Sequence, residues 1–70
     1  MKIAYIKPSF LNEKRVGLLP KHLPYCSPED ERRFEQGYGE ALGIPDEAYG
    51  AGGGYLRENL FAWADVIYRL

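Results

Sequence analysis

The sequence has little of the residues that build disulfides and metal centres. Its 70 residues include one cysteine and one histidine, so no internal disulfide can form. No run approaches the roughly 18 consecutive apolar residues that span a membrane. Met1 is followed by a strand-like run instead of the apolar core of a secretion signal. We therefore expect a protein of the reducing cytoplasm that has no membrane partner.

The sequence also has nearly equal numbers of acidic and basic residues. The formal net charge is −1, and acidic and basic residues are interspersed along the chain. No basic stripe is available to neutralise phosphates, so we expect no nucleic-acid partner. Hydrophobic residues make up 46% of the sequence, which argues against a disordered chain. A chain of this length forms at most one small domain with a marginal core.

Two segments have the composition of strands. In residues 2–6, "KIAYI", apolar side chains alternate to both faces, which is typical of a central strand. Pro8 ends this strand, and residues 7–15 are expected to form a loop. Residues 65–70, "DVIYRL", also have apolar side chains on both faces. Two such strands predict a parallel sheet covered on both sides, hence a three-layer α/β fold.

Two helices are predicted between these strands. Residues 44–52, "IPDEAYGAG", begin with proline and acidic residues and end in glycines, which favours a short helix. Residues 57–64, "RENLFAWA", place Leu60, Phe61 and Ala64 at helical spacing, so one helix face can lie on the sheet.

Residues 20–36 are ambiguous. Ser27 followed by Pro28 and two acidic residues resembles a helix start, and Gly37 would end that helix after Gln36. The only large apolar side chain in the proposed helix is Phe34, so such a helix would bury little. The pattern alone leaves helix and strand open.

Two features resemble ligand sites but have simpler explanations. The glycines of "GAGGG", residues 50–54, follow a predicted helix, whereas a dinucleotide cradle follows a strand and opens a helix. We interpret them as a helix C-cap and turn. His22, Cys26 and Asp30 recur every four residues, but intervening prolines break the helix that would align them. We expect neither a cofactor site nor a metal site.

Longer stretches of the sequence resemble a known family. "MKIAYIKPSFLNEKRVGLLP", then "EQGYGEALGIPDEAYGAGG" and "LFAWADVIYRL", resemble in order the N-terminal domain of the alanine dehydrogenase and pyridine nucleotide transhydrogenase family. The form "KPSF…NEKRVGLLP" is most similar to its N5-(carboxyethyl)ornithine synthase branch, whose members reductively join pyruvate to an amino-acid side-chain amine. The resemblance implies that residues 1–70 are the N-terminal part of a substrate-binding domain with a small, flavodoxin- or Rossmann-like parallel sheet. It also implies a strand near residues 32–36, which we prefer over the local helix.

The resemblance also implies one site residue. Arg15, in the "RV" pair of the motif, corresponds to the family arginine that holds the carboxylate of the keto acid. A planar guanidinium suits this role because it gives a carboxylate two parallel hydrogen bonds. Lys7 and Lys14 lie near the same loop in sequence, although ordinary solvation is the simpler expectation for both. We expect no catalytic residue in this chain.

The family's remaining machinery is not found in this sequence. A substrate lysine just after the last strand, the catalytic histidine and the Rossmann domain that binds NAD(P)H are all missing. We therefore expect the chain alone to be inactive and to bind no cofactor. Its expected partners are a pyruvate-like keto acid, an amino acid, and a second polypeptide or C-terminal part that carries the Rossmann domain, with self-association as an alternative. The competing hypothesis is a non-catalytic interaction or regulatory module derived from the same domain.

Overall fold

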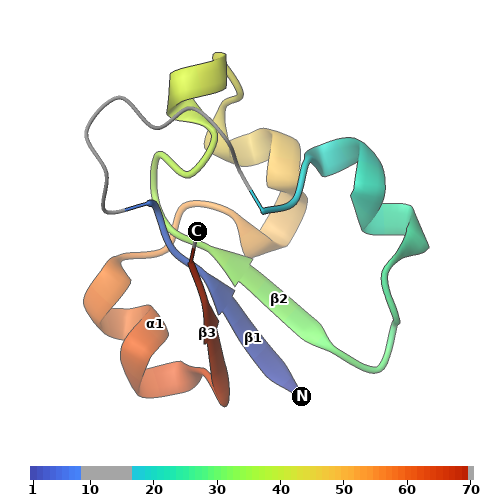
Figure 1. Cartoon of the computed structure of the whole chain (residues 1–70), viewed down its shortest axis with the longest axis vertical. Helices are drawn as coiled ribbons and strands as arrows, with labels where there is room; N and C mark the ends of the chain where they lie inside the picture. Colours follow the sequence, from blue (N-terminus) through green and yellow to red (C-terminus); the bar gives the residue numbers. More distant parts are fainter. Residues whose placement is uncertain (9–16, 70) are drawn as a thin grey trace.

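A three-stranded parallel sheet forms the centre of the chain in the computed structural model, which describes residues 1–8 and 17–69. The strands are β1 (Lys2–Tyr5), β2 (Glu31–Phe34) and β3 (Val66–Tyr68). Their order in the sheet is β2-β1-β3, so β1 is central (Figure 1). The predicted α/β class and the two strands predicted from apolar patterning are confirmed.

Short helices connect the strands. The α-helix α1 (Arg57–Trp63) precedes β3, as the apolar spacing predicted. The described ranges also contain three 3₁₀ helices, η1 (Pro20–Tyr25), η2 (Glu40–Leu42) and η3 (Asp46–Gly52). Within the described residues, no helix has the length and apolar content needed to cross a bilayer.

Each face of β1 packs into its own apolar cluster. Ala4 and Ile6 point to one face, where Leu60 of α1 is fully buried against them. Tyr5 points to the other face and stacks on Phe34 of β2, with ring centroids 4.7 Å apart. Tyr38 and Tyr49 complete this second cluster: the Tyr49 ring stacks on Phe34, and the Tyr38 ring is tilted against it. The sheet is thus the middle one of three layers.

The segment before β2 corrects the helix that its local sequence suggested. Ser27 begins a turn instead of a helix. Its Oγ accepts a hydrogen bond from the Glu29 amide at 3.3 Å, and its carbonyl accepts one from the Asp30 amide. The chain then enters β2 at Glu31 because Phe34 gains far more by packing into the aromatic cluster than by lying on an exposed helix. The strand inferred from the family resemblance is therefore right.

The glycine segment 50–54 ends η3 and turns the chain toward β2. Gly50 has a φ of 71°, in the region that glycine adopts without strain. Gly52 lies so close to the Arg32 carbonyl that a Cβ would overlap it. Tyr55 then forms a parallel bridge with Glu35 beside the end of β2. The interpretation of these glycines as a helix end and turn agrees with this geometry.

The last strand lies at an edge of the sheet. Its apolar residues on both faces are typical of a strand that further strands and layers cover. Its three side chains are all exposed. β3 pairs with β1 in parallel, and the register places Ile3 beside Val66 and Tyr5 beside Tyr68.

Candidate functional site

The carboxyl ends of the three strands meet at one end of the sheet. In open parallel sheets, ligands bind just beyond these ends. Lys7 follows β1 here, Glu35 follows β2, and Tyr68 closes β3. This end is the candidate site.

A buried carboxylate organises the site. Glu35 is 8% exposed and accepts a hydrogen bond from the Lys7 amide at 2.8 Å. Its two oxygens also accept from Nε and Nη2 of Arg57, each at 3.1 Å. This two-point ion pair uses the fork geometry of a guanidinium, which makes it directional as well as charged. Glu35 thereby joins the ends of β1 and β2 to the first residue of α1.

Two tyrosine hydroxyls bond to backbone groups of Gly17 and Leu18. The Gly17 amide donates to the Tyr38 hydroxyl at 2.9 Å, and the Tyr49 hydroxyl donates to the Leu18 carbonyl at 2.7 Å. Burial raises the pKa of Tyr38 from its ordinary 10.0 to about 12, and burial also raises the pKa of Tyr49. Each hydroxyl thus links the aromatic cluster to the backbone of residues 17 and 18.

Gly17 also lies directly against β3. A Cβ at this position would overlap the ring of Tyr68. The same ring is 5.3 Å from the ring of Tyr5, centroid to centroid. The absence of a side chain at Gly17 thus lets the segment pack on the end of the sheet.

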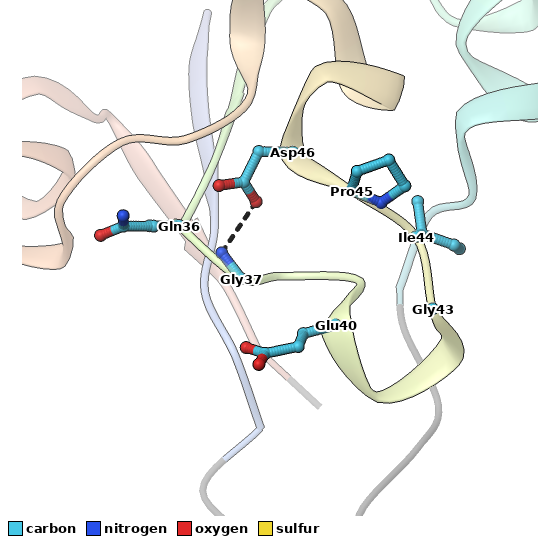
Figure 2. A pocket seen from close by; sticks show the side chains of 7 residues that line it. All are labelled: Gln36, Gly37, Glu40, Gly43, Ile44, Pro45 and Asp46. Atoms are coloured by element: carbon cyan, nitrogen blue, oxygen red, sulfur yellow. Dashed lines mark hydrogen bonds between the residues drawn. The ribbon is translucent and has the colours of Figure 1, made fainter.

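An open pocket of about 420 Å³ lies beside this end, between η2 and the start of η3. Figure 2 shows its polar groups, and the Gly37 amide donates to Oδ1 of Asp46 across its base at 2.8 Å. Glu40 reaches over Gly37, and the Lys7 ammonium lies 3.6 Å from the point where a Gly37 Cβ would stand. Of these two charged side chains, Glu40 lines the pocket. The residues that line it are Gln36, Gly37, Glu40, Gly43, Ile44, Pro45 and Asp46.

The predicted substrate residue lies outside the described residues. Arg15 and its neighbour Lys14 fall in the segment 9–16, so the structure does not test the role predicted for Arg15. The residues on either side are at the candidate site: Lys7 bonds to Glu35, and Gly17 bonds to Tyr38. Arg15 is two residues from Gly17 in the sequence.

In residues 1–8 and 17–69, the residues considered as metal ligands and the glycine segment make ordinary structural contacts. No group of three His, Cys, Asp or Glu side chains there could hold a metal ion. His22 instead uses its Nδ1 and carbonyl within η1, where they accept from Leu19 and Cys26. A Cβ at Gly52 would overlap the Arg32 carbonyl, and a Cβ at Gly53 would overlap the Asp46 carbonyl, so the glycine segment packs closely on its neighbours.

Sequence reasoning missed the Glu35–Arg57 pair and the tyrosine anchors. Glu35 stands directly after the predicted strand and Arg57 opens the predicted helix, but the pair spans 22 residues. The one available signal was an acidic residue at the carboxyl end of an apolar strand. The sequence around Tyr38 and Tyr49 does not reveal that their buried hydroxyls form hydrogen bonds with the backbone.

Comparison with known proteins supports the resemblance found in the sequence. The chain is 39% identical over 72 aligned residues to the N(5)-(carboxyethyl)ornithine synthase of Clostridium botulinum. It is 36% identical to that of Lactococcus lactis subsp. lactis and 35% identical to that of L. lactis strain IL1403. Each alignment covers all of this chain and 22% or 23% of the relative. The resemblance to the N-terminal part of these enzymes is confirmed.

The other two comparisons found no relatives. No family model matches the chain. No solved structure matches it at a significant level. The chain spans about a fifth of the length of the curated relatives it matches.

Proposed function

We propose that this chain, which resembles N(5)-(carboxyethyl)ornithine synthases along its whole length, is the substrate-binding N-terminal segment of an NAD(P)-dependent opine or amino-acid dehydrogenase. The reaction is either the reductive condensation of a pyruvate-like keto acid with an amino acid or the reductive amination of the keto acid. The remainder of the enzyme, in the same or a second polypeptide, carries the Rossmann domain and the catalytic residues. Residues 1–70 are inactive alone.

The match of the whole of this chain to about a fifth of these synthases is the observation that carries the proposal. The geometry of the sheet end supports it. The segment that contains Arg15 is bounded by Lys7 and Gly17, and hydrogen bonds to Glu35 and Tyr38 hold these two residues at the carboxyl end of the sheet. Ligands of open parallel sheets bind at that end.

Arg15 has a defined task in this proposal. Its guanidinium binds the keto-acid carboxylate through two parallel hydrogen bonds, which fixes the direction of the neighbouring carbonyl. In this proposal the rest of the enzyme binds NAD(P)H, and this chain supplies substrate binding.

A chimera tests the proposal. Residues 1–70 replace the matched segment of the C. botulinum relative, and consumption of NADH or NADPH is followed with pyruvate and ornithine. We expect turnover by the chimera, and none by the 70-residue chain or by the relative without its matched segment. A folded chimera that binds the cofactor but shows no turnover would contradict the proposal and favour a non-catalytic module.

A further inference from the structure

Arg33 of β2 lies on the face of the sheet that α1 covers. Its register partner on β1 is Ala4, which is buried against Leu60 of α1. The guanidinium carbon of Arg33 is 4.2 Å from the centre of the Trp63 ring and 4.6 Å from the centre of the Tyr55 ring. Both are cation-π contacts, in which a positive charge lies over a ring face. Two aromatic rings from different segments therefore hold this one guanidinium.

Both rings are fixed by the fold. The Tyr55 hydroxyl donates to the Ala51 carbonyl at 3.2 Å. The Tyr55 amide donates to the Phe34 carbonyl at 3.1 Å, and its carbonyl accepts from the Gln36 amide at 2.7 Å. Trp63 is the last residue of α1. The guanidinium is thus oriented before any ligand arrives, which lowers the entropy cost of binding one.

The partners of Arg33 differ from those of two other arginines. Arg57 pairs with Glu35, and Arg32 pairs with Asp30. Among residues 1–8 and 17–69, no ion pair and no side-chain hydrogen bond involves Arg33. Stacking on rings uses the flat faces of a guanidinium and leaves its in-plane N–H donors for another acceptor.

A cavity of about 240 Å³ opens beside Arg33 and is called the Arg33 pocket below. Its three residues from β2 are the first three of that strand, whereas the candidate site lies beyond the last. The pocket is therefore separate from the candidate site, and its volume suits a small ligand. The residues that line it are Glu31, Arg32, Arg33, Ala51, Gly52 and Tyr55.

Arg32 lines the pocket, but its donors are already used or covered. Its Nη1 donates to the Ser27 carbonyl at 3.2 Å, and its Nη2 donates to Oδ2 of Asp30 at 3.5 Å. Its Nε is buried, so a ligand in the pocket cannot reach it. Arg33 is therefore the arginine whose donors a ligand can use.

Two further charges lie near Arg33. Glu31 is two residues away on the same strand, so both side chains point to the same face. Lys2 is the register partner of Glu31, and its ammonium is 6.0 Å from the centre of the Trp63 ring, which also contacts Arg33. The charge of Lys2 offsets that of Glu31, and the charge of Arg33 is left to attract an anion.

We propose that the Arg33 pocket binds a phosphate group, either as free phosphate or as the phosphate of a small ester. The guanidinium donates two parallel hydrogen bonds to phosphate oxygens, while the two rings keep its plane fixed. A phosphate dianion gains more from Arg33 and Lys2 than a monocarboxylate does, because it carries more charge against the repulsion of Glu31. The inference is independent of the proposed function, since Arg33 is not part of the candidate site.

Titration with inorganic phosphate at constant ionic strength tests the site. The nitrogen-15 and proton resonances of the Arg33 side chain are followed by NMR in the 70-residue chain. We expect a saturable shift in the parent chain and in Arg32→Lys. Arg33→Lys keeps the charge but loses the planar fork, and should raise the Kd at least about tenfold. Equal Kd values for R33K and R32K would overturn the proposal.

Two further probes identify the ligand chemistry. Methyl phosphate that binds more tightly than inorganic phosphate indicates a phosphate ester as the ligand, and the reverse order indicates free phosphate. Acetate should bind more weakly than both. Acetate that binds as tightly as phosphate would contradict a phosphate site, because a single carboxylate would then suffice.

Glu31→Gln provides a variant that gains affinity. It removes the negative charge beside Arg33, so the Kd for inorganic phosphate should fall by about threefold or more. Glu58→Gln, on the exposed first turn of α1, is the matched control and should leave the Kd unchanged. The same Kd in E31Q and E58Q would place the bound anion outside this pocket.

Urea unfolding in phosphate gives a test that works even for a weakly folded chain. A ligand that binds the folded state alone raises the unfolding midpoint by mass action. Phosphate also stabilises proteins by exclusion from their surface, which affects R33K and R32K alike. We expect the midpoint of R32K to rise more than that of R33K at the same phosphate concentration. Equal rises in the two variants would refute specific binding at Arg33.

Discussion

Glu35 and Arg57 form a two-point ion pair in which each guanidinium nitrogen is 3.1 Å from its carboxylate oxygen. The pair joins the end of β2 to the start of α1, and the same carboxylate binds the Lys7 amide after β1. One side chain thus fixes three of the segments that meet at the candidate site.

Replacement of Glu35 by glutamine is expected to destabilise this junction. The change keeps the shape of the side chain but removes its charge and one acceptor, so the paired donors lose partners. We expect a loss of about 1–3 kcal/mol in the free energy of unfolding. Urea unfolding, followed by the fluorescence of Trp63, the sole tryptophan, measures this change in the free energy of unfolding. Sulfate in the buffer stabilises the small core during the measurement. Glu58→Gln, on the exposed first turn of α1, is the control. Equal stability of E35Q and E58Q would show that the pair contributes nothing.

Alkaline pH is expected to destabilise the fold through Tyr38. In the folded chain its pKa is about 12, and in the unfolded chain it returns to about 10. Between these values the unfolded state has lost a proton that the folded state keeps, so rising pH favours unfolding. The stabilisation is complete below pH 10 and is lost as the pH rises to 12, by an amount on the order of 2 kcal/mol.

Urea unfolding at a series of pH values measures this loss. Tyr38→Phe should flatten the decline above pH 10, although Tyr49, whose pKa burial also raises, leaves part of it. Tyr25→Phe is the control because Tyr25 is 88% exposed. An unchanged alkaline slope in Y38F would show that Tyr38 is not the group responsible.

A methyl group at Gly17 is expected to collide with Tyr68. Gly17→Ala should lower the free energy of unfolding by about 1–3 kcal/mol because the added Cβ overlaps the ring. Tyr68→Ala should remove most of this cost by making room. A double-mutant cycle on these two substitutions measures the coupling. Additive effects would mean that the two residues do not touch.

The apolar spacing of the sequence predicted β1 and α1 because both elements bury a face that their own residues define. Ala4 and Ile6 alternate with Tyr5, and Leu60 recurs at helical spacing with Ala64. Residues 31–34 were less predictable, since Ser27 and Pro28 give a helix-start signal that in fact produces a turn. The side chain that decides the matter is Phe34, and its partners Tyr5 and Tyr49 are distant in the sequence.

The environment of β3 and the contacts at the site could not be predicted from the sequence pattern. Alternating apolar residues indicate that Val66 to Tyr68 form a strand, but they do not say which neighbouring strands are present. The Glu35–Arg57 pair depends on the end of β2 approaching the start of α1, which is a property of the folded chain. Arg15 was identified through the family resemblance alone and lies outside the described residues.

The kcat/KM of the chimera for pyruvate tests the central claim most directly. Arg15→Lys keeps the positive charge but loses the two parallel hydrogen bonds to the keto-acid carboxylate. The account predicts that R15K lowers kcat/KM for pyruvate at least tenfold, which corresponds to about 1.4 kcal/mol. Arg32→Lys, in β2 and paired with Asp30, is the matched control and should leave kcat/KM unchanged. If R15K and R32K both retain the kcat/KM of the parent chimera, Arg15 does not bind the substrate and the account is contradicted.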